Sequence, residues 1–99
     1  MKESIERIND MEKIMDECRD ALEALHEALE RMENLQDDMG QLFAYYGSEV
    51  WFDDRELDLP PDTKAGVLSE DLLYDVIMDA RDAAFRMLEL GTDVLRNRI

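Results

Sequence analysis

A single helical turn in the first third of the chain combines two residue types that bind metal ions. Glu23 and His26 have the Glu-x-x-His spacing found in carboxylate di-metal helical bundles. His26 is the only histidine, and a dimer would supply two such pairs. A complete site also needs inward-facing glutamates from other helices. Glu23 lies away from the apolar stripe of its helix, so a carboxylate metal-binding bundle is only an alternative. His26 borders that stripe, and we expect it to pack at the edge of the helix core.

The acidic run from Asp53 to Asp58 offers a second group of oxygen ligands. Carboxylates at alternate positions suit Ca²⁺, but the EF-hand loop requires glycine at its sixth position and glutamate at its twelfth. With Asp54 as the first position, these places hold Leu59 and Ala65. We therefore expect an acidic turn between helices, and we predict neither a bound metal nor a cofactor.

Cys18 is the only cysteine, and it would act as a nucleophile only beside an activating base. The single histidine lies eight residues further along, which is about two helical turns. The sequence contains no P-loop, no dinucleotide-binding fingerprint and no nucleophile elbow. We predict no catalytic residue and no enzymatic activity. One cysteine also excludes a disulfide scaffold.

The 99 residues include 26 acidic and 11 basic side chains, which gives a net charge of −15. This charge argues against direct binding to nucleic acid or to an anionic membrane. No stretch approaches the roughly 18 apolar residues of a membrane span, and the N-terminal residues lack a signal-peptide pattern. We expect a cytoplasmic protein whose acidic surface keeps it in solution or binds a basic partner. Mimicry of nucleic-acid phosphates is an alternative function.

One long amphipathic helix is predicted from about residue 4 to residue 46, where apolar residues recur every three or four positions. Gln36 is the one polar residue at its core positions, and a bend is expected near Gly40. Further apolar residues widen the stripe on one side, which favours a bundle over a narrow coiled coil. The two core positions hold Ile8, Met15, Leu22, Leu29 and Phe43, and Met11, Cys18, Leu25, Met32, Met39 and Tyr46; the widening residues are Ile14, Ala21, Ala28, Leu35 and Leu42.

Turn residues replace the helical pattern over 47–68, but Trp51 predicts an ordered loop pinned onto the helices. Ser69 is a good N-cap for a second helix over about 69–96. These elements predict one all-α domain over 1–99, a long antiparallel helical hairpin with an ordered middle loop. The first helix outruns the second by about fifteen residues. We expect a second copy to cover the excess in a dimeric four-helix bundle; the alternative is a monomer completed by the middle segment.

Several short motifs resemble a bacterial family, domain of unknown function 4298. They are Arg7-Ile8 with Met11-Glu12, Tyr45-Tyr46-Gly47, Trp51 with Asp54, Leu59-Pro60, and Gly66-Val67-Leu68-Ser69-Glu70-Asp71 with Tyr74. The resemblance covers nearly the whole chain and is most specific at Gly66–Asp71. The family has a basic residue just before that glycine, where this chain has Ala65. The resemblance implies bacterial origin and a compact all-helical fold, and it supplies no catalytic residue.

Aromatic and acidic residues gather around the loop and the start of the second helix, and they form our candidate interaction surface. Aromatic side chains dominate the energetics of protein interfaces. We therefore predict a protein–protein interaction or regulatory module that binds an unknown, basic protein and also associates with itself. The candidate residues are Tyr45, Tyr46, Trp51, Phe52, Asp53, Asp54, Ser69, Glu70, Asp71 and Tyr74.

Overall fold

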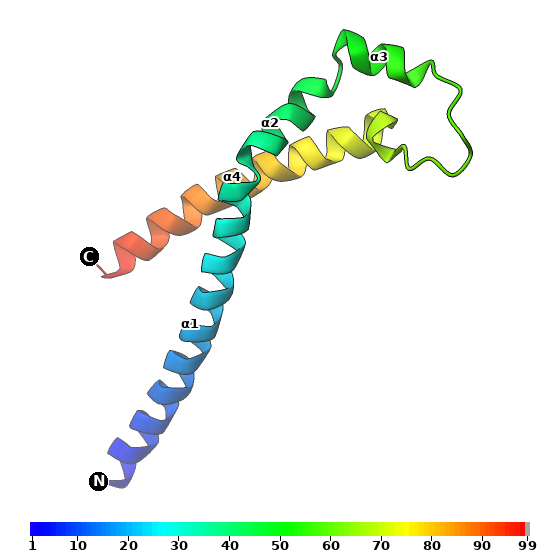
Figure 1. Ribbon diagram of the computed structural model, residues 1–99. Coiled ribbons are helices and arrows are strands. Elements are labelled where there is room, and N and C mark those ends of the chain that lie inside the picture. Colours follow the sequence, from blue (N-terminus) through cyan, green and yellow to red (C-terminus); the bar gives the residue numbers. More distant parts are fainter. Residues whose placement is uncertain (99) are drawn as a thin grey trace. The chain divides into compact units, whose positions relative to one another are not determined.

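The computed structural model describes residues 1–98; Ile99, the last residue of the expected 1–99 domain, lies outside the described part. Four α-helices and one short 3-10 helix, with no strand, make up this range, so the predicted all-α class is confirmed. The helices are α1 (Lys2–Asn34), α2 (Gln36–Tyr45), α3 (Glu49–Arg55), the 3-10 helix η1 (Gly66–Leu68) and α4 (Glu70–Arg98) (Figure 1). Within the same range, no helix is both long and apolar enough to span a membrane.

The chain forms two compact units, the first from Met1 to Met39 and the second from Gly40 onward. α1 fills most of the first unit as one unbroken helix of 33 residues (Figure 1). None of its side chains is buried, although apolar residues recur along one face. Ile8 and Met11, in the middle of that face, are 56% and 54% exposed. Helices in proteins gain most of their stability by packing such a face, so α1 lacks its main source of stability within its own unit.

The long first helix predicted over 4–46 is divided in the structure, and the break lies at Leu35 rather than at Gly40. The side-chain amide of Gln36 donates a hydrogen bond of 3.0 Å to the carbonyl oxygen of Met32, four residues earlier. This is the carbonyl that the backbone N–H of Gln36 would bind in a continuous helix. The polar residue at a core position therefore ends α1, whereas Gly40 lies inside α2.

A left-handed glycine separates α2 from α3 in the second unit. Gly47 has a φ of 75°, which a residue with a Cβ adopts only with strain. The hydroxyl of Ser48 then donates to the carbonyl of Tyr45 at 2.7 Å and accepts from the backbone N–H of Trp51 at 3.1 Å. Ser48 thus closes α2 and caps α3, a helix that the predicted loop over 47–68 did not include.

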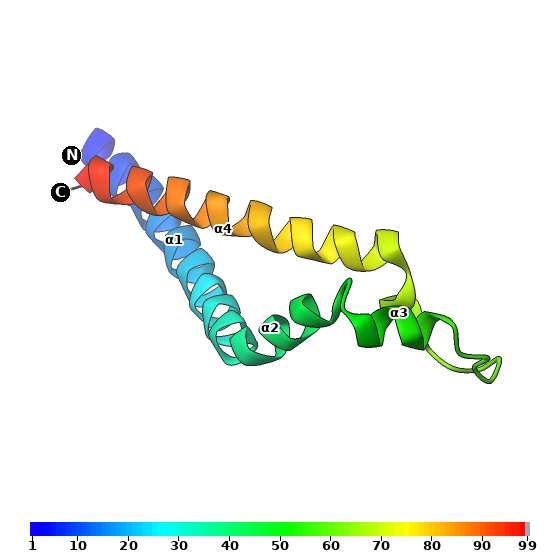
Figure 2. The same ribbon diagram turned by 90° about the horizontal axis from the view of Figure 1, so that it is seen from above.

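After α3 the chain curves outward and returns at η1, which packs against both α3 and the start of α4 (Figures 1 and 2). The Oγ of Ser69 accepts a hydrogen bond of 3.2 Å from the backbone N–H of Leu72, which confirms the predicted N-cap. Trp51 and Leu73 are the buried hydrophobic residues of the described chain, at 2% and 3% exposure. The core of the second unit therefore lies where α3, η1 and the first turns of α4 meet.

Candidate functional site

The ten residues of the predicted interaction surface come together in the second unit around Trp51. Five of them are buried or half-buried and form what we call the Trp51 scaffold: Tyr45, Tyr46, Trp51, Asp54 and Ser69. The other five are exposed and form what we call the acidic-aromatic rim: Phe52, Asp53, Glu70, Asp71 and Tyr74. Their role in binding stays a prediction, whereas the structure shows which of them face inward.

Polar and aromatic contacts with four residues hold Trp51 in place. Its indole Nε1–H donates to the carbonyl oxygen of Val67 at 3.0 Å, which ties α3 to η1. Its ring lies 5.0 Å between centroids from the rings of both Tyr46 and Phe52, at tilted and edge-on angles that favour aromatic pairs. The guanidinium of Arg55 lies 4.6 Å from the centroid of the indole ring. These contacts make Trp51 a structural residue rather than the exposed anchor of a binding surface.

A second link joins α2 to α3 at the side of the scaffold. The hydroxyl of Tyr45 donates to Oδ2 of Asp54 at 2.5 Å. This hydrogen bond raises the pKa of Tyr45 above its usual value, and partial burial and the negative charge of Asp54 act in the same direction. Tyr45 therefore stays protonated and keeps donating at neutral pH.

Partial burial also raises the pKa of Tyr46, and the nearby charge of Glu70 adds to the effect. Smaller contributions from Tyr74 and Asp71 raise this pKa further, whereas Arg55 lowers it. The carboxylates at the start of α4 thus lie close enough to Tyr46 to act on it electrostatically. They extend the rim from α3 onto α4.

The pH dependence of the Tyr45–Asp54 link can be measured directly. Because the folded-state pKa of Tyr45 is raised, this link stabilises the protein below the usual tyrosine pKa of about 10 and is lost as the pH rises through the raised value. In an absorbance titration of the phenolates, Asp54→Asn should lower the pKa of Tyr45 toward the usual value. Asp53→Asn removes the same charge at an exposed neighbour and serves as the control. Identical titrations of the wild type and Asp54→Asn would contradict the assignment.

Sequence reasoning missed an apolar groove on the second unit. The groove has a volume of about 380 Å³ and lies between the end of α2, η1 and the first turns of α4. Leu42 belongs to α2, whereas Leu72 and Leu73 belong to the first turns of α4. The residues that line it are Leu42, Lys64, Gly66, Val67, Leu72, Leu73 and Val76.

The candidates for metal binding and nucleophilic chemistry are dispersed on the surface. Cys18 and His26 are both exposed on α1. Within residues 1–98, no three His, Cys, Asp or Glu side chains lie close enough together to hold a metal ion.

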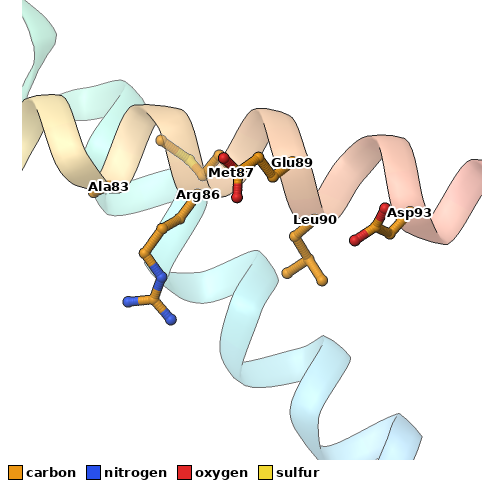
Figure 3. A pocket seen from close by; sticks show the side chains of 6 residues that line it. All are labelled: Ala83, Arg86, Met87, Glu89, Leu90 and Asp93. Atoms are coloured by element: carbon orange, nitrogen blue, oxygen red, sulfur yellow. The ribbon is translucent and has the colours of Figure 1, made fainter.

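A shallow depression on α4 is lined by Ala83, Arg86, Met87, Glu89, Leu90 and Asp93 (Figure 3). All six residues come from this one helix and are exposed, and the side chains of Arg86 and Leu90 point to the same side of it. The depression is therefore an open helix surface rather than an enclosed site.

Comparison with known proteins and protein families places the chain in a family. No curated protein and no solved structure matches the chain. The model of the family described as Domain of unknown function (DUF4298) matches residues 8–90, a range that includes the Trp51 scaffold, the whole rim and most of α1 and α4. The chain therefore belongs to the DUF4298 family.

Proposed function

We propose that this protein is a protein–protein interaction module that binds a basic segment of another protein at the acidic-aromatic rim. The observation that carries the proposal is the burial of Trp51, which fixes the elements that present the rim. Phe52 and Tyr74 are 54% and 50% exposed, although they lie next to the best-packed part of the chain. Exposed aromatic side chains on a rigid support are suited to anchoring a partner.

The charge of the rim supports a basic partner. Three of its five members, Asp53, Glu70 and Asp71, carry carboxylates, and none carries a positive charge. The whole chain has a net charge of −15, so its field attracts a basic surface from a distance. Such steering speeds association, whereas contacts with Phe52 and Tyr74 would slow dissociation. The proposed activity is binding, and no catalytic step is included.

The test pairs two phenylalanines of similar exposure. A tagged full-length chain is used to capture proteins from its native lysate, and the captured protein is then purified for binding measurements. Phe52→Ala should weaken the affinity of this chain for the captured protein by at least about tenfold, as expected for an interface anchor. Phe85→Ala on α4, where Phe85 is 52% exposed and outside the rim, should leave the affinity unchanged.

Two results would overturn this proposal. Equal affinities of the wild type and Phe52→Ala would remove the rim from the interface. If duplex DNA displaces the captured protein from this chain, and rim variants still bind that protein, the result would instead favour a nucleic-acid mimic. The like-charged pairs along α1, such as Asp16 with Asp20 and Glu23 with Glu27, would then be the surface to examine.

A further inference from the structure

α1 presents a surface that the rim does not use. We call the α1 stripe the eight residues at its two core heptad positions: Ile8, Met11, Met15, Cys18, Leu22, Leu25, Leu29 and Met32. None of them is buried, and Leu22 and Leu25 near the centre of α1 are 52% and 41% exposed. We propose that the α1 stripe binds the α1 stripe of a second copy in antiparallel orientation, with Glu12 of each copy facing Arg19 of the other.

The lengths of the helices show why the chain needs a second copy. α1 has 33 residues and α2 adds 10, whereas α4 has 29. No antiparallel pairing within one chain can therefore cover the whole apolar surface of α1 and α2. The middle segment does not supply the missing length, because α3 and η1 are already packed around Trp51. Part of the apolar surface of α1 is therefore left for another chain to cover.

The distribution of charge makes two copies compatible despite the acidity of the chain. Nine of the eleven acidic residues of α1 lie at the three heptad positions furthest from the stripe, where two paired helices would keep them in solvent. One border of the stripe is formed by Arg7, Ile14, Ala21 and Ala28, of which only Arg7 is charged. The other border carries Glu12 and Arg19, one heptad apart and of opposite charge, together with Ile5, His26 and Glu33.

An antiparallel pair of α1 helices has one register that pairs the opposite charges of the border and also brings most of the apolar positions together. In this register Ile8 faces Leu25 of the second copy, Met11 faces Leu22, and Met15 faces Cys18, so six of the eight residues of the α1 stripe are paired, whereas Leu29 and Met32 lie opposite Ser4 and Met1. Glu12 then faces Arg19 of the second copy, and the twofold symmetry forms this pair twice.

The neighbouring registers are disfavoured by charge. A shift of one heptad in one direction places Glu12 opposite Glu12 of the second copy. The same shift in the other direction places Arg19 opposite Arg19. Like charges at flanking positions weaken helix pairing and therefore destabilise these registers. Between two copies, the charges of this border therefore favour the alignment of Glu12 with Arg19 over the neighbouring one, which would pair all eight residues of the α1 stripe but set Arg19 against Arg19.

The proposed dimer contact goes beyond the proposed function, because it uses α1 and leaves the rim free. Its test needs no external partner. The dimer proposal can therefore fail while the proposal of partner binding at the rim stands, and the reverse also holds. The full-length chain is studied by sedimentation equilibrium over a range of concentrations, with the helix content of each variant checked by circular dichroism. The wild type should show a monomer–dimer equilibrium.

Charge reversal at the border tests the alignment. Arg19→Glu and Glu12→Arg should each raise the dimer Kd by about three- to tenfold, since each replaces two attractive pairs with two repulsive ones. Glu12→Arg lowers the net negative charge, so a general charge effect would strengthen the dimer instead. The double variant Glu12→Arg with Arg19→Glu should restore the wild-type Kd. Lys13→Glu makes the same charge change as Arg19→Glu on the opposite face, and it should leave the Kd within about twofold.

Three results would overturn the inference. A wild-type chain that stays monomeric at all concentrations would exclude self-association. A dimer unaffected by Arg19→Glu would exclude the proposed border. A parallel pair would set Arg7 against Glu12 of the second copy, so rescue of Glu12→Arg by Arg7→Glu instead of Arg19→Glu would exclude the antiparallel orientation.

Discussion

Replacing Trp51 with alanine should unfold the second unit under conditions in which the wild-type chain is folded. The indole is 2% exposed and donates to the carbonyl of Val67, so the change removes buried area and leaves that carbonyl without its partner. Truncation of a buried tryptophan to alanine costs about 3–5 kcal/mol. A domain of this size has a total free energy of unfolding of about 5 kcal/mol, so little would remain. Urea denaturation followed by far-ultraviolet circular dichroism measures the loss.

Phe52 provides the matched control for this prediction, because it is adjacent in sequence, aromatic and 54% exposed. Phe52→Ala loses the edge contact with the indole ring and should cost about 1 kcal/mol. An equal loss of stability in Trp51→Ala and Phe52→Ala would contradict the division between scaffold and rim. The same comparison shows why Trp51→Ala is a poor probe of binding, since it would remove the surface together with its support.

Leu73→Ala should destabilise the second unit by about 2–5 kcal/mol, the range for a buried leucine. Leu73 is 3% exposed in the first turns of α4, where it is one of the residues that line the apolar groove. Its neighbour Leu72 is 58% exposed, so Leu72→Ala removes the same atoms at much lower cost, about 0.5 kcal/mol. Thermal denaturation of the two variants at equal protein concentration gives the comparison. Similar midpoints for both would show that the core lies elsewhere.

The all-α class of this chain was predictable because the spacing of apolar residues along the sequence is enough to identify a helix. Apolar residues every three or four positions identify a helix wherever it packs, and Ser69 identifies the start of α4 by its hydroxyl. The break in the first helix was harder to place. Gly40 has the lower helix propensity, but glycine costs only about 1 kcal/mol inside a helix. Gln36 decides the break because its side chain competes for a backbone carbonyl, and that competition depends on a rotamer rather than on residue type.

The sequence places the residues of the predicted interaction surface close together along the chain, but it does not give their orientation. Nothing local to Trp51 distinguishes it from Phe52, and the difference depends on a carbonyl sixteen residues away at Val67. The helix α3 carried a signal that could have been used, since Ser48 precedes it and Glu49 lies in its first turn. Exposed Val50 and Leu57, beside the rim, were also passed over.

The chain contains one tryptophan, and the structure places it in the second unit. Its fluorescence therefore reports on the packing of α3 against η1, since the indole is shielded from water and hydrogen-bonded to Val67. The first unit carries no fluorophore of this kind, whereas α1 supplies 33 residues of the helical signal in circular dichroism. Tryptophan emission thus follows the second unit alone, whereas circular dichroism contains both units, since α4 supplies 29 further helical residues. A dimer that melts at α1 before the tryptophan emission shifts would reveal two independent transitions in a chain of 99 residues.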